Sequence, residues 1–402
     1  MSTPDPIIQI SPSLNGHHSK SPTGPTAILM LNLGGPQTTD DVGPYLERMF
    51  LDRELIPLPF QEWLGRFIAR RRTPKIQKKY AQIGGGSPIY QWTQHQGQQM
   101  VKWLDQISPE TAPHRFYIAF RYADPLTADA LHQMKADGVR RAVAFTQYPQ
   151  WSCSTTGASL NELWREILRL GLRDAFAWSL IDRWPTHPAF IEAIASKICE
   201  GLAQFPPAER DSVLLLFSAH SLPLSVVERG DAYPQEVAAT VQAVMQRLNF
   251  SHEFLLAYQS EIKPFKWLGP STEQVIRNLG AQRRRNVLVI PIAFTSDHIE
   301  TLHEIDIEFA ELAHEVGIAN FKRAPALNDD PRFARALAQI VAEHLRSSRI
   351  HSSQYKLRCP SCENPLCRTL LNPAKSSLSR DKHHTSGEAN GYEPTTSTAG
   401  AP

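Results

Sequence analysis

Short apolar runs alternate with longer segments of helical periodicity along most of this chain. The runs are rich in β-branched and aromatic residues, which favour strands. They are "AILMLNL" from Ala27, "FYIAFRY" from Phe116, "AVAFTQY" from Ala142, "VLLLFSAH" from Val213, "FLLAYQS" from Phe254 and "NVLVIPIAF" from Asn286. Strands that alternate with helices predict parallel sheets covered on both faces. We therefore expect an α/β protein with two Rossmann-like domains.

Changes in composition divide the chain into parts. The predicted parts are a disordered N-terminal segment at 1–26, a first α/β domain at 27–185, a second at 186–350, a cysteine-rich extension at 351–370 and a disordered tail at 371–402. The first and last parts are polar and poor in aromatic residues, which is typical of disorder. The two domains should meet near "IDRWPTHPAF".

Composition excludes few functions. The 402 residues are 42% hydrophobic, enough for a substantial core. The formal net charge of +2 and the lack of a basic-aromatic motif predict no nucleic-acid partner. No apolar run approaches the roughly 18 to 20 residues of a membrane-spanning helix, so we expect any membrane contact to be peripheral.

Two predicted strands end in titratable residues. "VLLLFSAH" ends at His220, and "NVLVIPIAF" runs into Asp297, His298 and Glu300. Ligands of open α/β sheets bind at the carboxyl ends of strands, so these residues are candidates for a reaction site. An imidazole accepts a proton near neutral pH, which makes His220 a candidate general base. The alternative is a hydrogen-bonded histidine under a loop.

An acidic stripe follows the last of these strands. On an ideal helix the stripe consists of Asp297, Glu300, Glu304 and Glu308, and the opposite face consists of Leu302, Ile305, Phe309 and Leu312. Ile307 interrupts the stripe, which indicates either a shallow polar face or a π-bulge. The stripe is either a solvated helix face or a path for protons or a divalent cation.

Three of the five cysteines, Cys359, Cys362 and Cys367, lie together in "CPSCENPLC". In a reducing compartment such clustering indicates a metal site rather than disulfides, and the CxxC spacing alone slightly favours zinc. Cys199 lies among apolar residues in "FIEAIASKICEGLAQF", where we expect a buried structural thiol.

An apolar and basic segment, "RMFLDRELIPLPFQEWLGRFIARRR", ends in Arg70, Arg71 and Arg72. Its apolar residues are Phe50, Leu51, Leu55, Ile56, Phe60, Trp63, Leu64 and Phe67. This mixture suits attachment to an anionic membrane surface, and the alternative is a helical hairpin packed on its own domain.

Several blocks of the chain resemble one family. They are "LNLGGP", "RRTPKIQKKY", "IGGGSPI", "FRYADPLT", "FTQYPQWSCSTTGASLNE", "FSAHSLP", "RGDAYPQEV", "WLGP" and "PIAFTSDHIETLHEID". Together they resemble the ferrochelatases over about Ala27 to Arg368. The resemblance implies a chelatase-type fold and a lyase that inserts Fe2+ into protoporphyrin IX, the terminal step of haem biosynthesis.

The resemblance also implies roles for individual residues. His220 would be the catalytic base, with Glu300 facing it across the macrocycle. Asp297 and His298 would support Glu300, while Glu304 and Glu308 would form a route for protons or metal. The residues implied to line the porphyrin pocket or meet its propionates are Tyr80, Ser87, Arg121, Tyr122, Trp267 and Phe294.

For the cysteines the resemblance favours a two-iron two-sulfur (2Fe-2S) cluster over zinc, with Cys153 of "WSCSTTG" as the fourth ligand. It further implies a homodimer attached peripherally to the matrix side of the mitochondrial inner membrane. Residues 1–26 match neither an Arg-rich transit peptide nor a secretory signal. Two alternatives stay open: a chelatase for coproporphyrin or another metal, and a non-catalytic porphyrin- or haem-binding protein, although the intact His220 and Glu300 argue against the latter.

Overall fold

The computed structural model describes residues 24–349, apart from 57, 263–264 and 348, and also residue 352. None of the described helices is both long and apolar enough to cross a membrane. The predicted disordered segments at 1–26 and 371–402 and the extension at 351–370 lie wholly or almost wholly outside the described residues.

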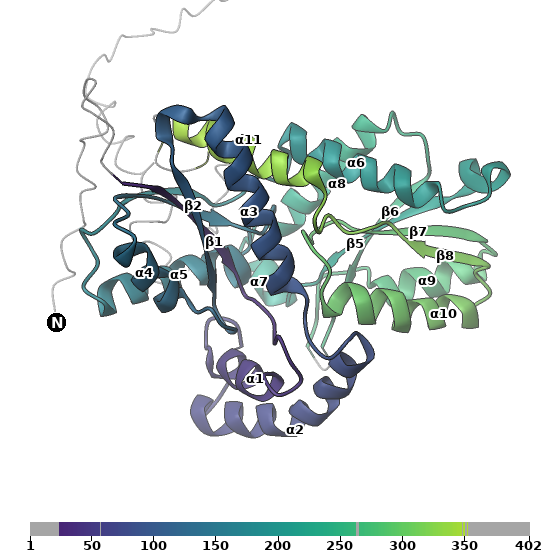
Figure 1. Ribbon diagram of the computed structural model, residues 1–402. Helices are drawn as coiled ribbons and strands as arrows, with labels where there is room; N and C mark the ends of the chain where they lie inside the picture. The colour runs from purple at the N-terminus through teal and green to yellow at the C-terminus, as the bar shows by residue number, and fades with distance from the viewer. Residues whose placement is uncertain (1–23, 57, 263–264, 348, 350–351, 353–402) are drawn as a thin grey trace, which may run out of the picture.

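Two parallel sheets of the same topology form the framework (Figure 1). The first contains β1 (Thr26–Asn32), β2 (His114–Phe120), β3 (Arg141–Thr146) and β4 (Ala177–Ile181), in the order β2-β1-β3-β4. The second contains β5 (Leu214–His220), β6 (Phe254–Gln259), β7 (Asn286–Pro291) and β8 (Asn320–Arg323), in the order β6-β5-β7-β8. In each sheet the first strand lies between the next two, so the chain changes direction beside it. Such a switch point opens a crevice at the carboxyl ends of the strands.

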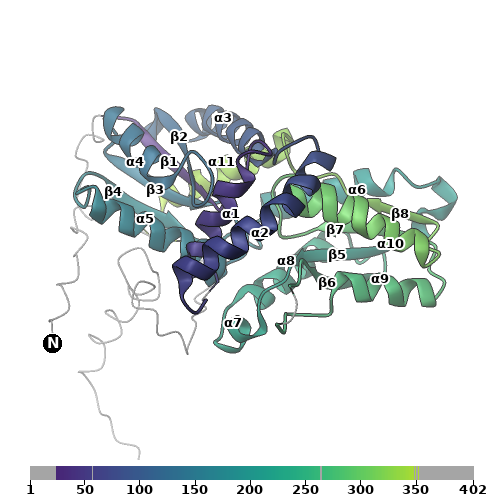
Figure 2. The same ribbon diagram turned by 90° about the horizontal axis from the view of Figure 1, so that it is seen from below.

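The helices that belong with the first sheet are α1 (Val42–Leu51), α2 (Gln61–Gln82), α3 (Ile89–Ile107), α4 (Thr127–Ala136) and α5 (Ala158–Arg169), with the π-helical turn η2 (Cys153–Gly157) and the 3-10 turn η1 (Pro109–Thr111). The later helices are α6 (Pro188–Leu202), α7 (Leu224–Glu228), α8 (Tyr233–Arg247), α9 (Thr272–Ala281), α10 (Ala310–Glu315) and α11 (Pro331–Arg346), with the 3-10 turn η3 (Pro207–Ser212) and the π-helix η4 (Glu300–Phe309). Figure 1 shows α1 and α2 at the lower side of the molecule, and Figure 2, seen from below, shows them in front, between the two sheets.

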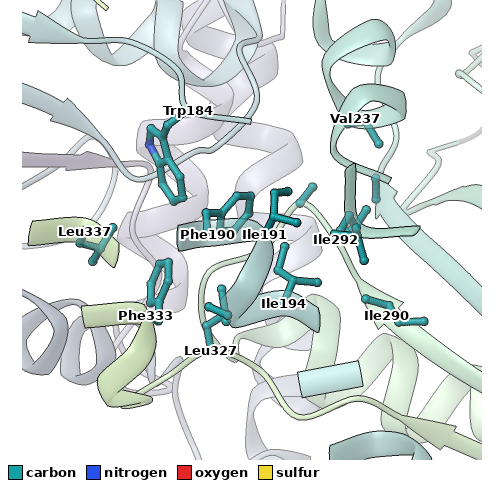
Figure 3. Close-up of a cluster of buried hydrophobic side chains, with 14 of the residues drawn as sticks. Trp184, Phe190, Ile191, Ile194, Val237, Ile290, Ile292, Leu327, Phe333 and Leu337 are labelled. Carbon is teal, nitrogen blue, oxygen red and sulfur yellow. The ribbon is translucent and has the colours of Figure 1, made fainter. Parts of the chain in front are cut away.

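One hydrophobic cluster joins the two halves. Trp184, which follows β4, packs edge-on against Phe190 of α6 with ring centroids 4.8 Å apart, and both rings contact Phe333 of α11 (Figure 3). The cluster includes residues of both sheets, such as Ile28 and Leu215. The boundary predicted near residue 185 falls between β4 and α6, and the division into two domains stays a prediction.

A buried ion pair also links the two halves. Glu236 of α8 accepts hydrogen bonds from the Trp151 backbone N–H at 2.7 Å and from Arg183 at 2.5 Å. Burial raises the pKa of Glu236 to about 7, although the Arg183 guanidinium opposes that shift. These contacts connect the loop after β3 with α8.

The six predicted strands are confirmed as β1, β2, β3, β5, β6 and β7. The pattern missed β4 and β8, because β4 is short and β8, "NFKR", is a half-polar edge strand. Of the two alternatives for Ile307, the irregular helix is confirmed, since η4 is a π-helix. The buried position expected for Cys199 is wrong: the side chain is exposed, because α6 directs Ile191, Ile194 and Ile198 inward and turns Cys199 toward solvent.

Candidate active site

His220 stands at the carboxyl end of β5, the central position of the second sheet. Its Nδ1 lies 2.6 Å from the backbone oxygen of Ser221. A carbonyl oxygen only accepts, so Nδ1 carries a hydrogen and, in the neutral ring, Nε2 has the lone pair. The side chain is half-buried, which leaves Nε2 available as a proton acceptor.

The neighbouring strand brings η4 to the same edge. Gln259 of β6 pairs in register with His220. Its Nε2 donates to the Glu300 backbone oxygen at 2.9 Å and to Glu304 Oε2 at 3.0 Å. The first turn of η4 is therefore fixed beside the end of β5, and the structure brings His220 and Glu300 to one site.

Glu300 and His298 form a close carboxylate–imidazole pair. His298 Nδ1 donates to the Ser296 oxygen at 2.9 Å, and its Nε2 lies 3.2 Å from Glu300 Oε2. A neutral Nε2 and an ionised carboxylate are both acceptors, so the pair is suited to share one proton between the two side chains. The Phe294 ring packs edge-on against the His298 ring, with the two ring centroids 4.5 Å apart, and fixes the orientation of the imidazole.

Asp297 has a different part in the loop before η4. Its carboxylate accepts from Thr301 at 2.9 Å, from Arg323 at 2.9 Å and from Asn328 Nδ2 at 2.7 Å. Arg323 also binds Asp306 on η4. With its oxygens engaged, Asp297 holds the loop that presents His298 and Glu300.

Glu304 is held by neutral donors. It accepts from the Ser260 N–H at 2.8 Å, from the Ser260 hydroxyl at 2.5 Å and from Gln259. Burial raises the pKa of Glu304, and the nearby Glu300 charge adds to this, against the effect of the hydrogen bonds. Glu308, farther along η4, is exposed and forms an ion pair with Lys79 of α2 at 2.6 Å.

Three buried tyrosines lie near enough to Glu300 for its charge to affect them. Burial raises the pKa of the Tyr45, Tyr80 and Tyr148 hydroxyls, and the charge of Glu300 raises each of them further. Tyr148 donates to Asn32 Oδ1 at 2.9 Å and accepts from the Leu33 N–H at 2.8 Å. Of the three, the sequence singled out Tyr80 alone.

The residues that sequence reasoning missed are Tyr45, Tyr148, Gln259 and Ser260. Tyr148, Gln259 and Ser260 follow or end predicted strands, so the strand-end rule that found His220 could have found them. Tyr45 lies within α1, and no pattern in that helix distinguishes it.

Arg121 and Tyr122 lie at the carboxyl end of the first sheet and are engaged by acids. Arg121 contacts Asp52 and donates to Glu54 at 3.0 Å, and the Tyr122 hydroxyl donates to Asp52 at 2.6 Å. The second terminal nitrogen of Arg121 has no hydrogen-bond partner among the described residues. Arg121 and Tyr122 line a cavity of about 600 Å³ together with Arg165 of α5.

The other predicted porphyrin contacts lie on loops. Ser87 is buried, its N–H donates to the Pro36 oxygen at 2.7 Å, and a Cβ on Gly35 would come within 2.8 Å of the Ser87 hydroxyl. Trp267 forms a β-bridge with Pro223 in the loop after His220. Trp267 therefore lies near the second sheet edge, whereas Ser87 lies beside the loop that leaves β1.

Cys153 begins η2 and is half-buried. Its N–H donates to Asp231 at 2.7 Å, and Asp231 also accepts from the Ser152 hydroxyl. Cys359, Cys362 and Cys367 lie outside the described residues, within which no group of three metal-binding side chains is found. Ser352, the last residue described, contacts Asp182.

The chain was compared with known proteins. Residues 25–345 match the family model described as Ferrochelatase. "Ferrochelatase, mitochondrial" of Xenopus laevis is 57% identical over 343 residues, covering 85% of this chain and 84% of that protein. The protein of the same name from Bos taurus is 56% identical over 344 residues, covering 85% and 83%. The solved structure "SirB from Bacillus subtilis with Fe3+" aligns with a TM-score of 0.47 at 12% identity, covering 81% of this chain and 97% of that one, a similarity too weak to carry an argument. By the match to the family model and to these relatives, the chain belongs to the ferrochelatase family.

Proposed function

We propose that this chain is a lyase that inserts Fe2+ into protoporphyrin IX and forms protohaem, the terminal step of haem biosynthesis. The observation that carries the proposal is the convergence of the His220 imidazole and the Glu300–His298 pair at one sheet edge. Its membership of the ferrochelatase family supports the same reaction.

The reaction replaces two pyrrole N–H protons by one divalent cation, so two protons must leave the macrocycle for each Fe2+ that enters. His220 Nε2 carries the lone pair that accepts the first proton, because its Nδ1 hydrogen is committed to Ser221. The Glu300–His298 pair lies at the same edge and receives the second proton when it is in its singly protonated form.

The carboxylates Glu300, Glu304 and Glu308, here called the carboxylate row, lead away from this site along η4. The raised pKa of Glu304 makes it a better proton acceptor than an ordinary carboxylate, which suits a group that takes and releases protons. We therefore propose the row as the route by which protons leave.

Aromatic faces suit a flat conjugated ligand, and Tyr80, Phe294 and Trp267 lie around the Glu300 and His220 loops. The free Arg121 nitrogen and the Ser87 hydroxyl are donors for the propionates. The support for these roles is that these residues lie at the carboxyl edges of the two sheets, on the side of the molecule where α2 lies.

The reaction is tested by supplying anaerobic Fe2+ with protoporphyrin or with coproporphyrin and identifying the product by its absorption spectrum. Protohaem from protoporphyrin is expected. Faster turnover of coproporphyrin would replace the substrate in the proposal, and porphyrin binding without metal insertion would leave a binding protein.

We also propose a 2Fe-2S cluster held by Cys153, Cys359, Cys362 and Cys367. Support comes from Cys153, whose N–H donates to Asp231, and from Ser352, which contacts Asp182. Asp182 pairs with Arg183, which contacts Glu236 and through it the Trp151 N–H, two residues before Cys153. Four thiolates are the usual ligands of such a cluster, which when bound supplies a covalent link between distant segments. Iron and acid-labile sulfide should both fall to near zero in Cys153→Ser and stay unchanged in Cys199→Ser.

The names of the relatives support a mitochondrial location. We propose attachment to the matrix side of the inner membrane as a homodimer. Phe60 is 86% exposed, and Trp63 and Phe67 stack on the exposed face of α2 next to the exposed Arg70 and Arg71. Flotation with vesicles containing cardiolipin should fall strongly in a Trp63→Ser, Phe67→Ser variant. Analytical sedimentation, which gives the mass of the particle, tests the homodimer.

A further inference from the structure

The outer end of the carboxylate row is blocked by a cation from another helix. Lys79 of α2 places its Nζ 2.6 Å from Glu308 Oε1, although the two residues are 229 positions apart in the chain. The Lys79 side chain is only 27% exposed, so its stem lies against the protein rather than in solvent. This contact is part of the packing of α2 on η4.

His303 lies beside Glu308 and makes the outer end of the carboxylate row suited to bind a cation. Its side chain is 6% exposed, and its Nε2 lies 2.7 Å from Gln82 Oε1, so Nε2 carries the hydrogen and Nδ1 a lone pair. Nδ1 has no hydrogen-bond partner among the described residues and lies 3.7 Å from Glu308 Oε1. An imidazole lone pair and a carboxylate that face each other repel unless a positive charge lies beside them.

An imidazole nitrogen and a carboxylate are also common ligands of divalent transition metals. We propose that Lys79 is a specificity-determining residue that keeps divalent cations out of the outer end of the carboxylate row, by holding its ammonium group where Glu308 and His303 would otherwise bind a metal ion. The inference rests on the proposed function only in treating the carboxylate row as the path by which protons leave the site. It deepens that function by giving protons and Fe2+ different routes. Protons leave along the row, and Fe2+ reaches the porphyrin from another side.

The charges around His303 agree with this assignment. Burial lowers the pKa of the His303 imidazole, the Lys79 charge lowers it further, and the Glu308 and Glu311 carboxylates oppose the shift. A neutral imidazole keeps its lone pair, so the place stays suited to a metal ion once the ammonium group is removed.

The test is calorimetric titration with CoCl2 in the absence of porphyrin, which needs no turnover. Lys79→Met should gain a Co2+ site at least about tenfold tighter than any that the parent shows there. The gain should vanish in Lys79→Met, Glu308→Gln. Lys78→Met is the matched control, because Lys78 is an exposed lysine of the same helix, and it should titrate like the parent. Co2+ bound at His220 or Glu300 is common to all variants and cancels in the comparison.

Two results would overturn the inference. One is a Lys79→Met protein with the parent's melting temperature and the parent's isotherm. The other is a parent that loses a Co2+ site when Glu308→Gln is introduced alone, since metal would then bind despite Lys79. Lys79→Gln repeats the test with a polar side chain should the methionine disturb folding. Haem formation is assayed separately, so failure of the proposed reaction and failure of this inference give different results.

Discussion

The two sheets share one strand order but use their carboxyl edges differently. At the first edge, Arg121 and Tyr122 are engaged by Asp52 and Glu54, so the Arg121 charge is neutralised within the protein. At the second edge, the neutral His220 ring has a lone pair on Nε2, and Glu300 pairs with His298 close to three buried tyrosines. Duplicating a fold thus supplies two ligand-facing edges, and the hydrogen-bonding partners decide which one reacts.

The difference has an energetic meaning. A buried ion pair that is fully hydrogen-bonded rigidifies its surroundings, and removing one partner leaves an uncompensated charge. Groups left with unused lone pairs or raised pKa values contribute less to stability and are available for proton transfer. Substitutions at the first edge should therefore lower stability, and substitutions at the second edge should lower the rate.

The largest effect is expected at the second edge. His220→Ala should lower the rate of haem formation by about 10^3-fold, because general-base catalysis of this kind contributes roughly 10^2- to 10^4-fold. The melting temperature should change little, since among the described residues the ring is held by a hydrogen bond to a backbone carbonyl. His132→Ala, at an exposed position on α4, is the matched control. A His220→Ala protein that turns over normally would remove the basis for calling this edge reactive.

The first edge should respond in stability instead. Glu54→Gln takes a charge from Arg121, whose side chain is 3% exposed, and from Arg165. Because Asp52 still contacts Arg121, we expect a loss of about 2 kcal/mol in the free energy of unfolding, below the range for a fully broken buried pair. Urea denaturation measures it, and Glu62→Gln on the exposed face of α2 should be neutral. An unchanged midpoint would show that the first edge does not depend on this pair.

The sequence predicted most of the fold because central strands of parallel sheets are continuously apolar, and it located His220 and Glu300 because both follow such strands. It could not predict which charges would be neutralised. Lys79 meets Glu308 across 229 residues, and Glu54 meets Arg121 across 67. Helix and strand periodicity report only on neighbours along the chain, whereas pairing between distant elements depends on how helices pack. Tyr45 was missed for the same reason, since nothing within α1 indicates that η4 lies beside it.

The smallest expected effect is that of Glu304→Gln on the free energy of unfolding. It tests the comparison most sharply, because its sign is opposite to that of Glu54→Gln. Burial raises the pKa of Glu304 above its ordinary value, so the folded state holds the proton more tightly than the unfolded state does. The parent is then most stable below the unfolded pKa and loses stability as pH rises toward the folded pKa. A glutamine at this position does not titrate. The stability of Glu304→Gln relative to the parent should therefore rise with pH.

We expect this relative gain to develop as pH rises from about 5 to 8, above the ordinary glutamate pKa, and urea denaturation across that range measures it. Other titrating groups are common to both proteins and cancel in the difference. Glu315→Gln, at an exposed carboxylate of α10, should show no trend. A difference that stays flat or falls with pH would mean that the hydrogen bonds from Ser260 and Gln259 keep Glu304 ionised. Glu304 would then be a neutralised structural charge like Glu54, and the contrast between the two edges would be confined to His220, His298 and Glu300.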